Sequence, residues 1–289
     1  AGLAFSTVAA SRGHDVTLFE AADEIGGQFN LAKQIPGKEE FHETLRYYRK
    51  QLELTNVDVR LNTIADADQI AAEGFDEVVI AAGVKPRKID TPGEDHPKVL
   101  SYVEVLRDRR PVGQRVAIIG AGGIGFDVAE FLSHQEDETP SQNIDQFMDQ
   151  WGVDMDFNHR GGIKPAEHPP SPREIFLLQR TDGKLGERLG KTTGWIHRTT
   201  LANKKVNMMD GVQYEKIDDQ GLHITRNGNL DVLMVDNVIV CAGQIPDRDL
   251  EQPFADKGIK THLIGGADVA AELDAKRAIR QGSELAARI

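Results

Sequence analysis

The stretch RVAIIGAGGIGFDVAEFL, residues 115–132, limits the fold of this chain more than any other segment. Residues 115–119 predict a strand, Gly120, Gly122 and Gly125 form G-x-G-x-x-G, and a helical pattern follows. In this order the first glycine permits a tight turn, the second lets a pyrophosphate approach the backbone, and the third lets the helix pack closely on the strand. The sequence therefore predicts a dinucleotide site with the phosphates at a helix N-terminus. A glycine-rich turn without a ligand is the alternative.

Short apolar runs alternate with helical patterns along the chain, which is typical of a parallel sheet covered by helices. Two stretches, EVVIAAGVKP and NVIVCAGQIP, share an apolar strand, an Ala-Gly turn and a proline at the same offset, with Gly83 and Gly243 in equivalent places. This repetition indicates two copies of one architecture. Strands are predicted at residues 16–19, 57–61, 77–81, 115–119, 174–178, 206–209, 237–241 and 262–264, and helices at 39–54, 122–132 and 275–287.

The residue that would contact the ribose is expected at the end of the strand after the glycine turn. That strand ends in FLLQR, so Gln179 and Arg180 stand where an acid would favour NADH. Because a guanidinium can pair with a 2′-phosphate, Arg180 favours NADPH. The stretch around Arg180 is basic in an acidic chain, although a solvated loop is an equally good explanation. Its basic residues are Arg180, Lys184, Arg188 and Lys191.

The first copy carries part of a second nucleotide site. Gly2 matches the last glycine of a fingerprint whose beginning is not in this sequence, and Glu20 closes the strand VTLFE as a potential ribose acceptor. In EIGGQFN, Gly26 and Gly27 could bring the backbone, with Gln28, close to the cofactor. A water-facing glutamate at a strand end is the alternative for Glu20.

Near the C-terminus, HLIGGADVAAELDAKRAIRQG places Asp268 after a strand and a glycine turn. Asp268 could hold a polyol hydroxyl. The helix predicted from Ala275 could direct its N-terminal amides at the electron-rich edge of a flavin. An aspartate that simply caps this helix is the alternative.

Composition excludes several functions. The formal charge of −12 disfavours nucleic acid and anionic membrane surfaces as partners. With Cys241 alone, the chain can form no internal disulfide and no iron–sulfur cluster, and it fits a reducing, cytoplasmic compartment best. Within VIVCAG this cysteine reads as a buried apolar residue. No apolar run spans a bilayer, no signal peptide is apparent, and no catalytic triad or metal site is predicted, since His197 and the other histidines are scattered.

Residues 134–172 interrupt the alternation with QEDETPSQN, HRGG and EHPPSP around one apolar island. They are expected to form a long surface excursion from the second nucleotide-binding unit.

Five segments together resemble the C-terminal part of bacterial NADPH-dependent 2,4-dienoyl-CoA reductases. They are GGQFNLAKQIPGKEEF, IGAGGIGFDVA, LGKTTGWIHRTTL, VDNVIVCAGQ and HLIGGADVAAELDAKRAI. The resemblance implies an α/β fold with two Rossmann-like domains of the glutathione-reductase type. Residues 1–95 and 246–289 would form a discontinuous FAD-binding domain, and 96–245 an inserted NADPH-binding domain.

The resemblance also implies the reaction, a hydride transfer from NADPH to FAD. In that family, electrons then pass through a [4Fe–4S] cluster to FMN, and a barrel on the N-terminal part reduces the dienoyl-CoA. That part, the first strand of the FAD domain and two of its glycines are expected to be missing here, so no catalytic acid or base is predicted. Two alternatives remain open: an NADPH-oxidising subunit of another iron–sulfur flavoenzyme, and a non-catalytic nucleotide-binding scaffold.

Overall fold

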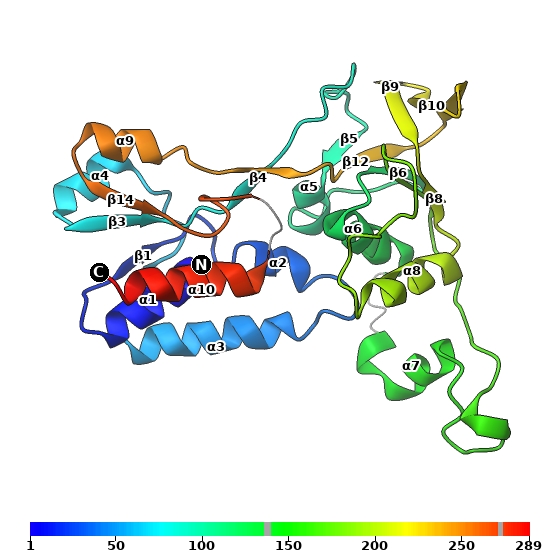
Figure 1. The fold of residues 1–289 in the computed structure, drawn as a ribbon, viewed down its shortest axis with the longest axis horizontal. Coiled ribbons are helices and arrows are strands. Elements are labelled where there is room, and N and C mark those ends of the chain that lie inside the picture. Colours follow the sequence, from blue (N-terminus) through cyan, green and yellow to red (C-terminus); the bar gives the residue numbers. More distant parts are fainter. Residues whose placement is uncertain (136–139, 271–273) are drawn as a thin grey trace. The chain divides into compact units, whose positions relative to one another are not determined.

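The computed structural model describes residues 1–135, 140–270 and 274–289. Its contacts divide the chain into two units (Figure 1). Unit 1 consists of Ala1–Asn30, Glu40–Lys85 and Gln244–Ile289, and unit 2 of Leu31–Glu39 and Pro86–Gly243. Unit 2 differs in extent from the expected NADPH domain, 96–245, because it also includes residues 31–39 and 86–95 and ends at Gly243.

The short segment Leu31–Glu39 belongs to unit 2 because its apolar side chains lie in the core of that unit. Leu31 and Ile35 are buried in one cluster with Phe126, Leu132 and Leu201. Sequence periodicity gives no sign of this association, because the partners are more than 80 positions away in the chain.

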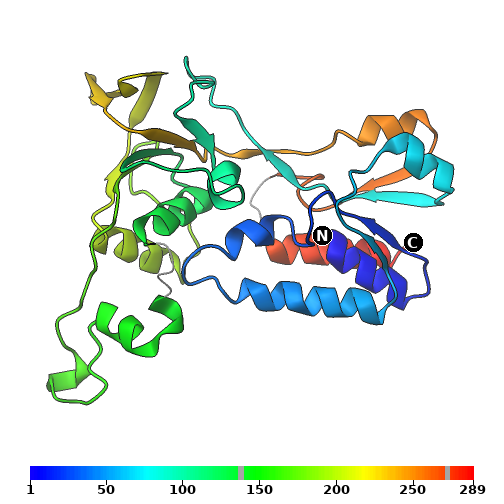
Figure 2. The same ribbon diagram turned by 180° about the vertical axis from the view of Figure 1, so that it is seen from behind.

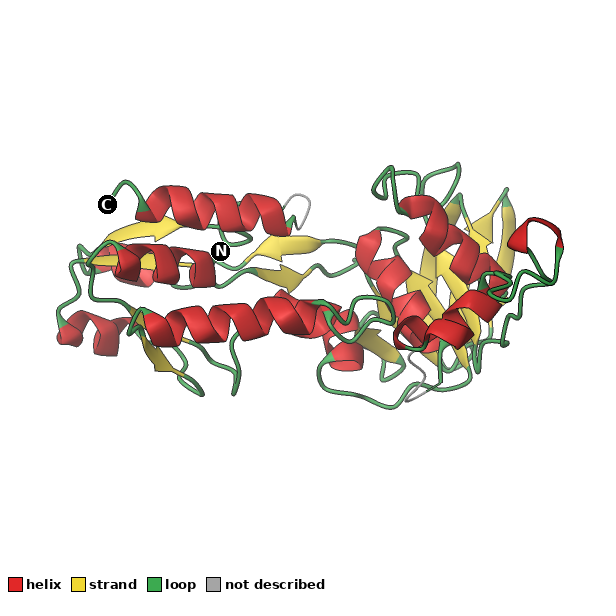
Figure 3. Ribbon diagram, turned by 90° about the horizontal axis from the view of Figure 1, so that it is seen from below, coloured by secondary structure: helices red, strands yellow, loops and turns green. Residues whose placement is uncertain are grey.

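Unit 2 is built on a parallel five-stranded sheet of order β5-β12-β6-β7-β8. Along the central strand, Val116 and Ile118 face one hydrophobic cluster, while Ala117 and Ile119 face another, and all four are fully buried. The first cluster lies under helices, which Figure 3 shows as a layer beside the strands. The elements are β5 Val99–Ser101, α5 Tyr102–Leu106, β6 Arg115–Ile119, α6 Gly123–Ser133, β7 Glu174–Leu178, α8 Gly194–Asn203, β8 Asn207–Met209 and β12 Asn237–Val240.

The second cluster packs the sheet against an antiparallel three-stranded sheet, which the sequence did not predict. Its strands are β9 Val212–Asp218, β10 Gly221–Arg226 and β11 Asn229–Leu233, in the order β11-β10-β9. Leu222 and Ile224 of β10 are completely buried in this cluster. Both faces of the parallel sheet are thus covered.

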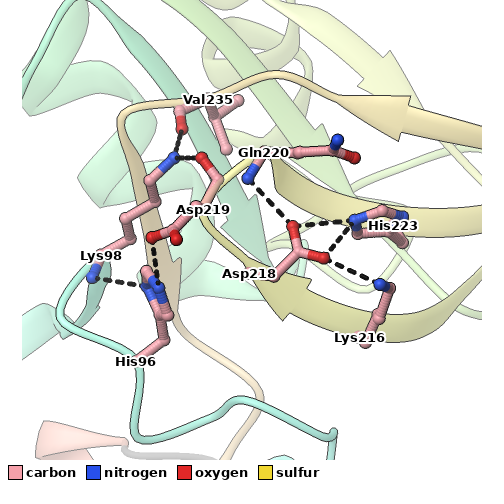
Figure 4. Close-up of polar contacts among 8 residues, drawn as sticks. All are labelled: His96, Lys98, Lys216, Asp218, Asp219, Gln220, His223 and Val235. Carbon is pink, nitrogen blue, oxygen red and sulfur yellow. Dashed lines mark hydrogen bonds and ion pairs between the residues drawn. The ribbon is translucent and has the colours of Figure 1, made fainter.

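Polar contacts close the β9–β10 turn and join it to the segment before β5 (Figure 4). Asp218 accepts hydrogen bonds from Lys216 and His223, which hold its pKa well below the usual value. Next to it, His96 lies 3.2 Å from a carboxylate oxygen of Asp219, whose carbonyl accepts from Lys98 at 2.6 Å. These contacts stabilise the edge of unit 2.

The excursion contains more regular structure than a surface loop. Its described part has η1 Pro140–Gln142, α7 Ile144–Gln150 and η2 Arg160–Gly162, with an isolated bridge between Val153 and Ile163. Trp151, directly after α7, packs edge-to-face against Trp195 of α8. The excursion is therefore attached to unit 2 through an aromatic contact.

Unit 1 has three helices side by side, α1, α3 and α10, seen from both sides in Figures 1 and 2. The helices α1 and α10 approach so closely that a Cβ at Gly282 would lie 2.5 Å from the carbonyl oxygen of Ala1. Its parallel strands form two separate pairs, β1 with β2 and β3 with β14. The elements are α1 Gly2–Ser11, β1 Thr17–Phe19, α3 Phe41–Leu54, β2 Asp58–Arg60, α4 Ala67–Glu73, β3 Glu77–Ile80, β4 Val84–Pro86, β13 Gln244–Pro246, α9 Glu251–Asp256, β14 Lys260–Leu263 and α10 Ala275–Ala286. A short helix, α2 Gln28–Ala32, runs from unit 1 into Leu31–Glu39.

The α/β class is confirmed, and the predicted strands at 115–119 and 174–178 have the predicted bounds. The other predicted strands and helices are present with ends shifted by one or two residues.

Replacing Ile35 with alanine tests whether Leu31–Glu39 is part of the core of unit 2. Ile35 is 1% exposed, so the cavity left behind is expected to cost about 2–5 kcal/mol of unfolding free energy. Both tryptophans of the chain lie in unit 2, and their fluorescence therefore follows the denaturant unfolding of that unit. As a control, Ile64→Ala at a 78%-exposed position should change stability by less than about 0.5 kcal/mol. An unchanged fluorescence midpoint for Ile35→Ala would contradict the assignment.

Candidate functional site

The turn between β6 and α6 requires glycine at its first position. Gly120 has a φ of 106°, and a Cβ there would lie 2.5 Å from the carbonyl oxygen of Cys241, which directly follows the neighbouring strand β12. A side chain would thus meet both backbone strain and a steric clash. The turn leaves the sheet at the carboxyl ends of the strands, the edge at which open α/β sheets bind ligands.

The other two fingerprint glycines have different surroundings. At Gly125 a Cβ would approach the carbonyl oxygen of Gly120 to 1.8 Å, so α6 packs directly on the turn. At Gly122, the N-cap of α6, no atom lies within 4 Å of a Cβ, and the φ of −81° suits any residue. The backbone at Gly122 is therefore open to a ligand, and the arrangement fits a pyrophosphate at the helix N-terminus.

Arg180 follows the end of β7, where a backbone hydrogen bond joins this strand to the glycine turn. The carbonyl of Leu178 accepts a hydrogen bond of 2.9 Å from the Gly120 N–H. Arg180 follows two residues later and is exposed, as is Arg188 on the same loop, and neither forms an ion pair with a described residue. Gln179 instead donates through Nε2 to the carbonyl of Thr181, which shapes this loop. Arg180 is thus available to an anionic ligand.

A carboxylate and an ammonium group form an ion pair just after the glycine turn, and no sequence pattern predicted this pair. Asp127 lies two residues after Gly125, and Lys38 of the segment Leu31–Glu39 donates to its Oδ1 at 2.6 Å. Burial raises the pKa of Asp127, while the Lys38 charge opposes this rise. Its place directly after the fingerprint could have suggested Asp127, but no local pattern marks Lys38. The pair presents one acceptor and one donor at adjacent atoms.

Two residues that the sequence assigned to structural roles are found in packed positions. His197 of α8 lies 3.1 Å from a carboxylate oxygen of Glu130 on α6, and this contact joins the two helices. Cys241 is buried beside the glycine turn, and its burial raises the pKa of the thiol. The thiol is therefore kept protonated and has no nucleophilic character at neutral pH.

In unit 1, Glu20 lies directly after β1, at the strand end where a ribose acceptor is expected. Its Oε1 accepts from the Ala22 N–H at 3.0 Å, and its backbone N–H donates to the carbonyl of Arg60 at 3.0 Å. No hydrogen bond to Oε2 is found within the described part of the chain. The carboxylate is thus oriented by the turn and retains acceptor capacity for a hydroxyl group.

The segment after Glu20 has one closely packed and one open glycine. Gly26 has a φ of 135°, and a Cβ there would lie 2.7 Å from Leu45, whereas Gly27, with a φ of 53°, has no atom within 4 Å of a Cβ. Gln28 begins α2. At Gly2, the first residue of α1, a Cβ would be 3.1 Å from the Cβ of Ala81, the residue after β3. Gly27 therefore leaves room for a close backbone approach by a ligand, whereas the start of α1 packs closely on Ala81.

Gly83 and Gly243 have the same conformation in the two repeated segments, with φ of 82° and 102°. Such positive values favour glycine strongly. The strands that follow these glycines, β4 and β13, pair with each other. The sequence repeat therefore corresponds to a two-stranded ribbon.

Asp268 is already bound by protein groups. Gln281 of α10 donates to its Oδ2 at 2.7 Å, and the guanidinium of Arg248 donates to its carbonyl oxygen. Helix α10 begins at Ala275, and its N-cap is Asp274, which accepts from the Lys276 N–H at 2.8 Å. The alternative that Asp268 caps the helix is therefore wrong. A ligand at Asp268 would have to use Oδ1.

The described part of the chain contains neither a metal-binding cluster nor a membrane-spanning helix. Within residues 1–135, 140–270 and 274–289, no three side chains of the metal-binding types come together as a metal site. In the same ranges, no helix has the length and apolarity needed to cross a membrane.

Two alanine substitutions separate the roles of the glycines. Gly125→Ala should lower the unfolding free energy by about 3 kcal/mol, because the added Cβ would overlap the backbone at Gly120. Gly122→Ala should leave stability nearly unchanged but weaken the binding of a dinucleotide about tenfold, since the methyl group would occupy the open backbone approach. Chemical denaturation and calorimetric titration measure the two effects. Equal effects of both substitutions on stability would contradict this division.

Comparison with known proteins agrees with this geometry. A metal reductase of Desulforamulus reducens is 30% identical over 271 residues, which cover 92% of this chain and 39% of that protein. The structure of a 2-naphthoyl-CoA reductase complex matches with a TM-score of 0.82 and 26% identity, over 99% of this chain and 38% of that one. This chain thus spans about two fifths of the length of these two proteins.

The structure of a thioredoxin reductase of T. acidophilum has the same fold as this chain, and the match covers almost the full length of both proteins. Its TM-score is 0.65 at 13% identity, with coverage of 99% of this chain and 93% of that one. Residues 1–276 match the family described as pyridine nucleotide-disulphide oxidoreductase, whose members bind FAD and NAD(P)H. This chain belongs to that family.

Proposed function

We propose that the chain is the electron-input part of an NADPH-dependent 2,4-dienoyl-CoA reductase acting in fatty-acid oxidation in the cytoplasm. Unit 2 would bind NADPH and unit 1 would bind FAD. The observation that carries the NADPH site is the open backbone at Gly122 between two glycines that permit no side chain, with the exposed Arg180 on the adjoining loop. The five segments resembling dienoyl-CoA reductases, above all LGKTTGWIHRTTL, support the choice of substrate.

The fingerprint and the loop after β7 would divide the work of holding NADPH. The N-terminal amides of α6 at Gly122 would hold the pyrophosphate, because their partial positive charge faces the open approach. Arg180 and Arg188 would pair with the 2′-phosphate, which NADH lacks. Selectivity for NADPH would therefore depend on charge at this loop.

The residues of unit 1 fit an FAD molecule at three points. Glu20 would accept a hydrogen bond from a ribose hydroxyl, and Gly26, Gly27 and Gln28 would allow the backbone to approach the nucleotide. Asp268 would hold a polyol hydroxyl through Oδ1, and the N-terminus of α10 at Ala275 would face the flavin. Gly2, Gly83 and Gly243 would keep neighbouring backbone segments free of side chains. FAD, when bound, supplies acceptance of a hydride from NADPH.

The remaining steps of a dienoyl-CoA reductase would lie on parts outside this chain. A [4Fe–4S] cluster and FMN would carry the electrons, and a barrel domain would bind the dienoyl-CoA. This proposal agrees with the larger size of the proteins that this chain resembles.

Flavin reduction tests the central step. After the chain is reconstituted with FAD under anaerobic conditions, addition of NADPH should bleach the absorbance of the oxidised flavin. Persistence of the oxidised spectrum, with NADPH shown to bind, would favour a non-catalytic scaffold. Consumption of a dienoyl-CoA by the intact natural protein would distinguish the proposed enzyme from an NADPH-oxidising subunit of another flavoenzyme.

Arg180→Ala tests the cofactor preference. Removal of a charged hydrogen-bond donor to the 2′-phosphate should weaken NADPH by about 10- to 100-fold and NADH by less than about twofold. Dissociation constants from calorimetric titration measure both. The matched control is Arg160→Ala, an exposed arginine of the excursion, which should leave both constants unchanged. Equal losses for the two cofactors at Arg180 would remove this residue from the 2′-phosphate site.

A further inference from the structure

The excursion exposes a group of large apolar side chains within its described residues, 140–172. None of the seven residues of α7 is buried, and the loop that follows α7 projects from the rest of unit 2 (Figures 1 and 2). The exposed side chains, with their exposed fractions, are Ile144 63%, Phe147 41%, Met155 53%, Phe157 83% and Ile163 71%. Exposed apolar side chains gathered on one segment commonly mark an interaction surface.

The excursion loop, residues 152–164, has a defined shape. An isolated antiparallel bridge between Val153 and Ile163 joins its two ends. Inside the loop, the carboxylate of Asp154 accepts a hydrogen bond of 2.6 Å from the His159 N–H and lies 2.9 Å from Nδ1 of the same histidine. Asp154 is only 6% exposed. The apolar side chains of this loop are therefore carried by an ordered backbone.

Phe157 is held in a strained conformation although its ring is not buried. Its φ is 56°, a left-handed value that is uncommon for a bulky residue. Its side chain is 83% exposed, so unit 2 gains little apolar burial from holding it there. Strained residues that the surrounding structure keeps in place are concentrated at functional and binding sites. Phe157 is thus positioned as an aromatic anchor for a pocket on another molecule.

The charges around Phe157 favour a partner with a positively charged surface. Residues 140–172 contain five acidic side chains and two basic ones. Lys164 is paired with an acid of α7, which leaves Arg160 as the exposed cation of the excursion loop. Asp156, next to Phe157, is exposed and forms no ion pair with a described residue. An apolar pocket with a cationic edge would therefore match the excursion loop.

The same chain has a pocket of this kind in unit 2, between the loop after β7 and α8. Its volume is about 740 Å³, and its apolar lining includes Leu185, Trp195 and Met208. Trp195 is 53% exposed, so its ring is accessible to a second aromatic ring, and aromatic pairs stabilise an interface beyond their burial. The cavity can therefore accommodate a phenylalanine side chain.

The edge of this cavity is positively charged. The loop after β7, residues 180–191, contains four basic and two acidic side chains. Lys184 lines the cavity, is exposed and forms no ion pair with a described residue. The acid in the lining, Asp210, is already paired with Arg226 at 2.8 Å. The edge is thus complementary in charge to the excursion loop.

We propose that two copies of this chain associate by exchanging their excursion loops, so that Phe157 of each enters the cavity of the other and Asp156 pairs with Lys184. Trp195 of the cavity packs on Trp151, directly before the excursion loop, so loop and cavity adjoin each other within unit 2. One two-fold axis can therefore form both contacts at once, and the assembly closes as a dimer. This dimer needs no cofactor and is independent of the function proposed above.

Sedimentation equilibrium of the full 289-residue chain tests the dimer. The wild type should show a reversible monomer–dimer equilibrium between about 1 and 100 µM, as transient interfaces do. Phe157→Ala should raise the dissociation constant at least about tenfold, because each dimer loses two anchors. The matched control is Leu230→Ala, a 79%-exposed residue of β11 in unit 2, which should leave the constant unchanged.

The opposite outcome is equally clear. A wild-type chain that is monomeric at every concentration would overturn the proposal. If Phe157 were then shielded from hydroxyl-radical labelling in the intact natural protein but not in the 289-residue chain, the surface would be covered by the rest of that protein and not by a second copy.

A charge exchange tests the pairing of Asp156 with Lys184. Asp156→Lys and Lys184→Asp should each raise the dimer dissociation constant about tenfold, because like charges would then face each other. A chain carrying both substitutions should return to within about threefold of the wild type, since opposite charges meet again across the two-fold axis. A double variant as weak as the single ones would show that this cavity does not receive the excursion loop.

NADPH gives a further readout, which alone rests on the function proposed above. Because Lys184 lies on the same loop as Arg180, bound NADPH should compete with the excursion loop and raise the dimer dissociation constant about tenfold at saturation. An unchanged constant with NADPH shown to bind would contradict the assignment of the cavity. Absence of NADPH binding, while the dimer responds to the charge exchange as expected, would contradict the proposed function and leave the dimer supported.

Discussion

The approach of Gly125 to the carbonyl of Gly120 is the constraint on which the nucleotide unit depends. A methyl group at Gly125 would be 1.8 Å from that oxygen, so α6 can begin at the turn only where no side chain exists. The position of α6 in turn directs its N-terminal amides toward the open backbone at Gly122. The residues after it, Asp127 and Glu130, are thereby placed against Lys38 and His197. One steric contact therefore orients both the helix N-terminus that is proposed to hold the pyrophosphate and the ion pairs that follow it.

The parallel sheet that leads into this turn is buried on both faces by two hydrophobic clusters. Alternate residues of β6 enter two different hydrophobic clusters, one with helices and one with the antiparallel sheet. Polar groups are consequently excluded from the strand and collect at its carboxyl end. The candidate ligand-binding positions lie at that end, because open α/β sheets bind ligands outside the carboxyl ends of their strands.

The local charge of the loop after β7 is positive, although the net charge of the whole chain is negative. The chain carries −12 overall, yet the loop after β7 exposes Arg180, Lys184 and Arg188 beside a paired Asp210. Long-range repulsion of anions by the whole molecule is screened at physiological ionic strength over about 8 Å. Recognition of a phosphate is therefore decided by the few groups within contact distance.

The sequence by itself determined the α/β class, the fingerprint turn and the repeated strand–glycine units, because these depend on short continuous apolar runs that alternate with helical patterns and on positions where only glycine is free of strain. The tertiary structure alone decided that Lys38 pairs with Asp127, that Trp151 packs on Trp195, and that Ile35 completes the core of unit 2. Each of those contacts joins residues that are at least 44 positions apart in the chain. Local propensity carries no information about such pairs, since burial and charge pairing are satisfied only when the whole chain has folded.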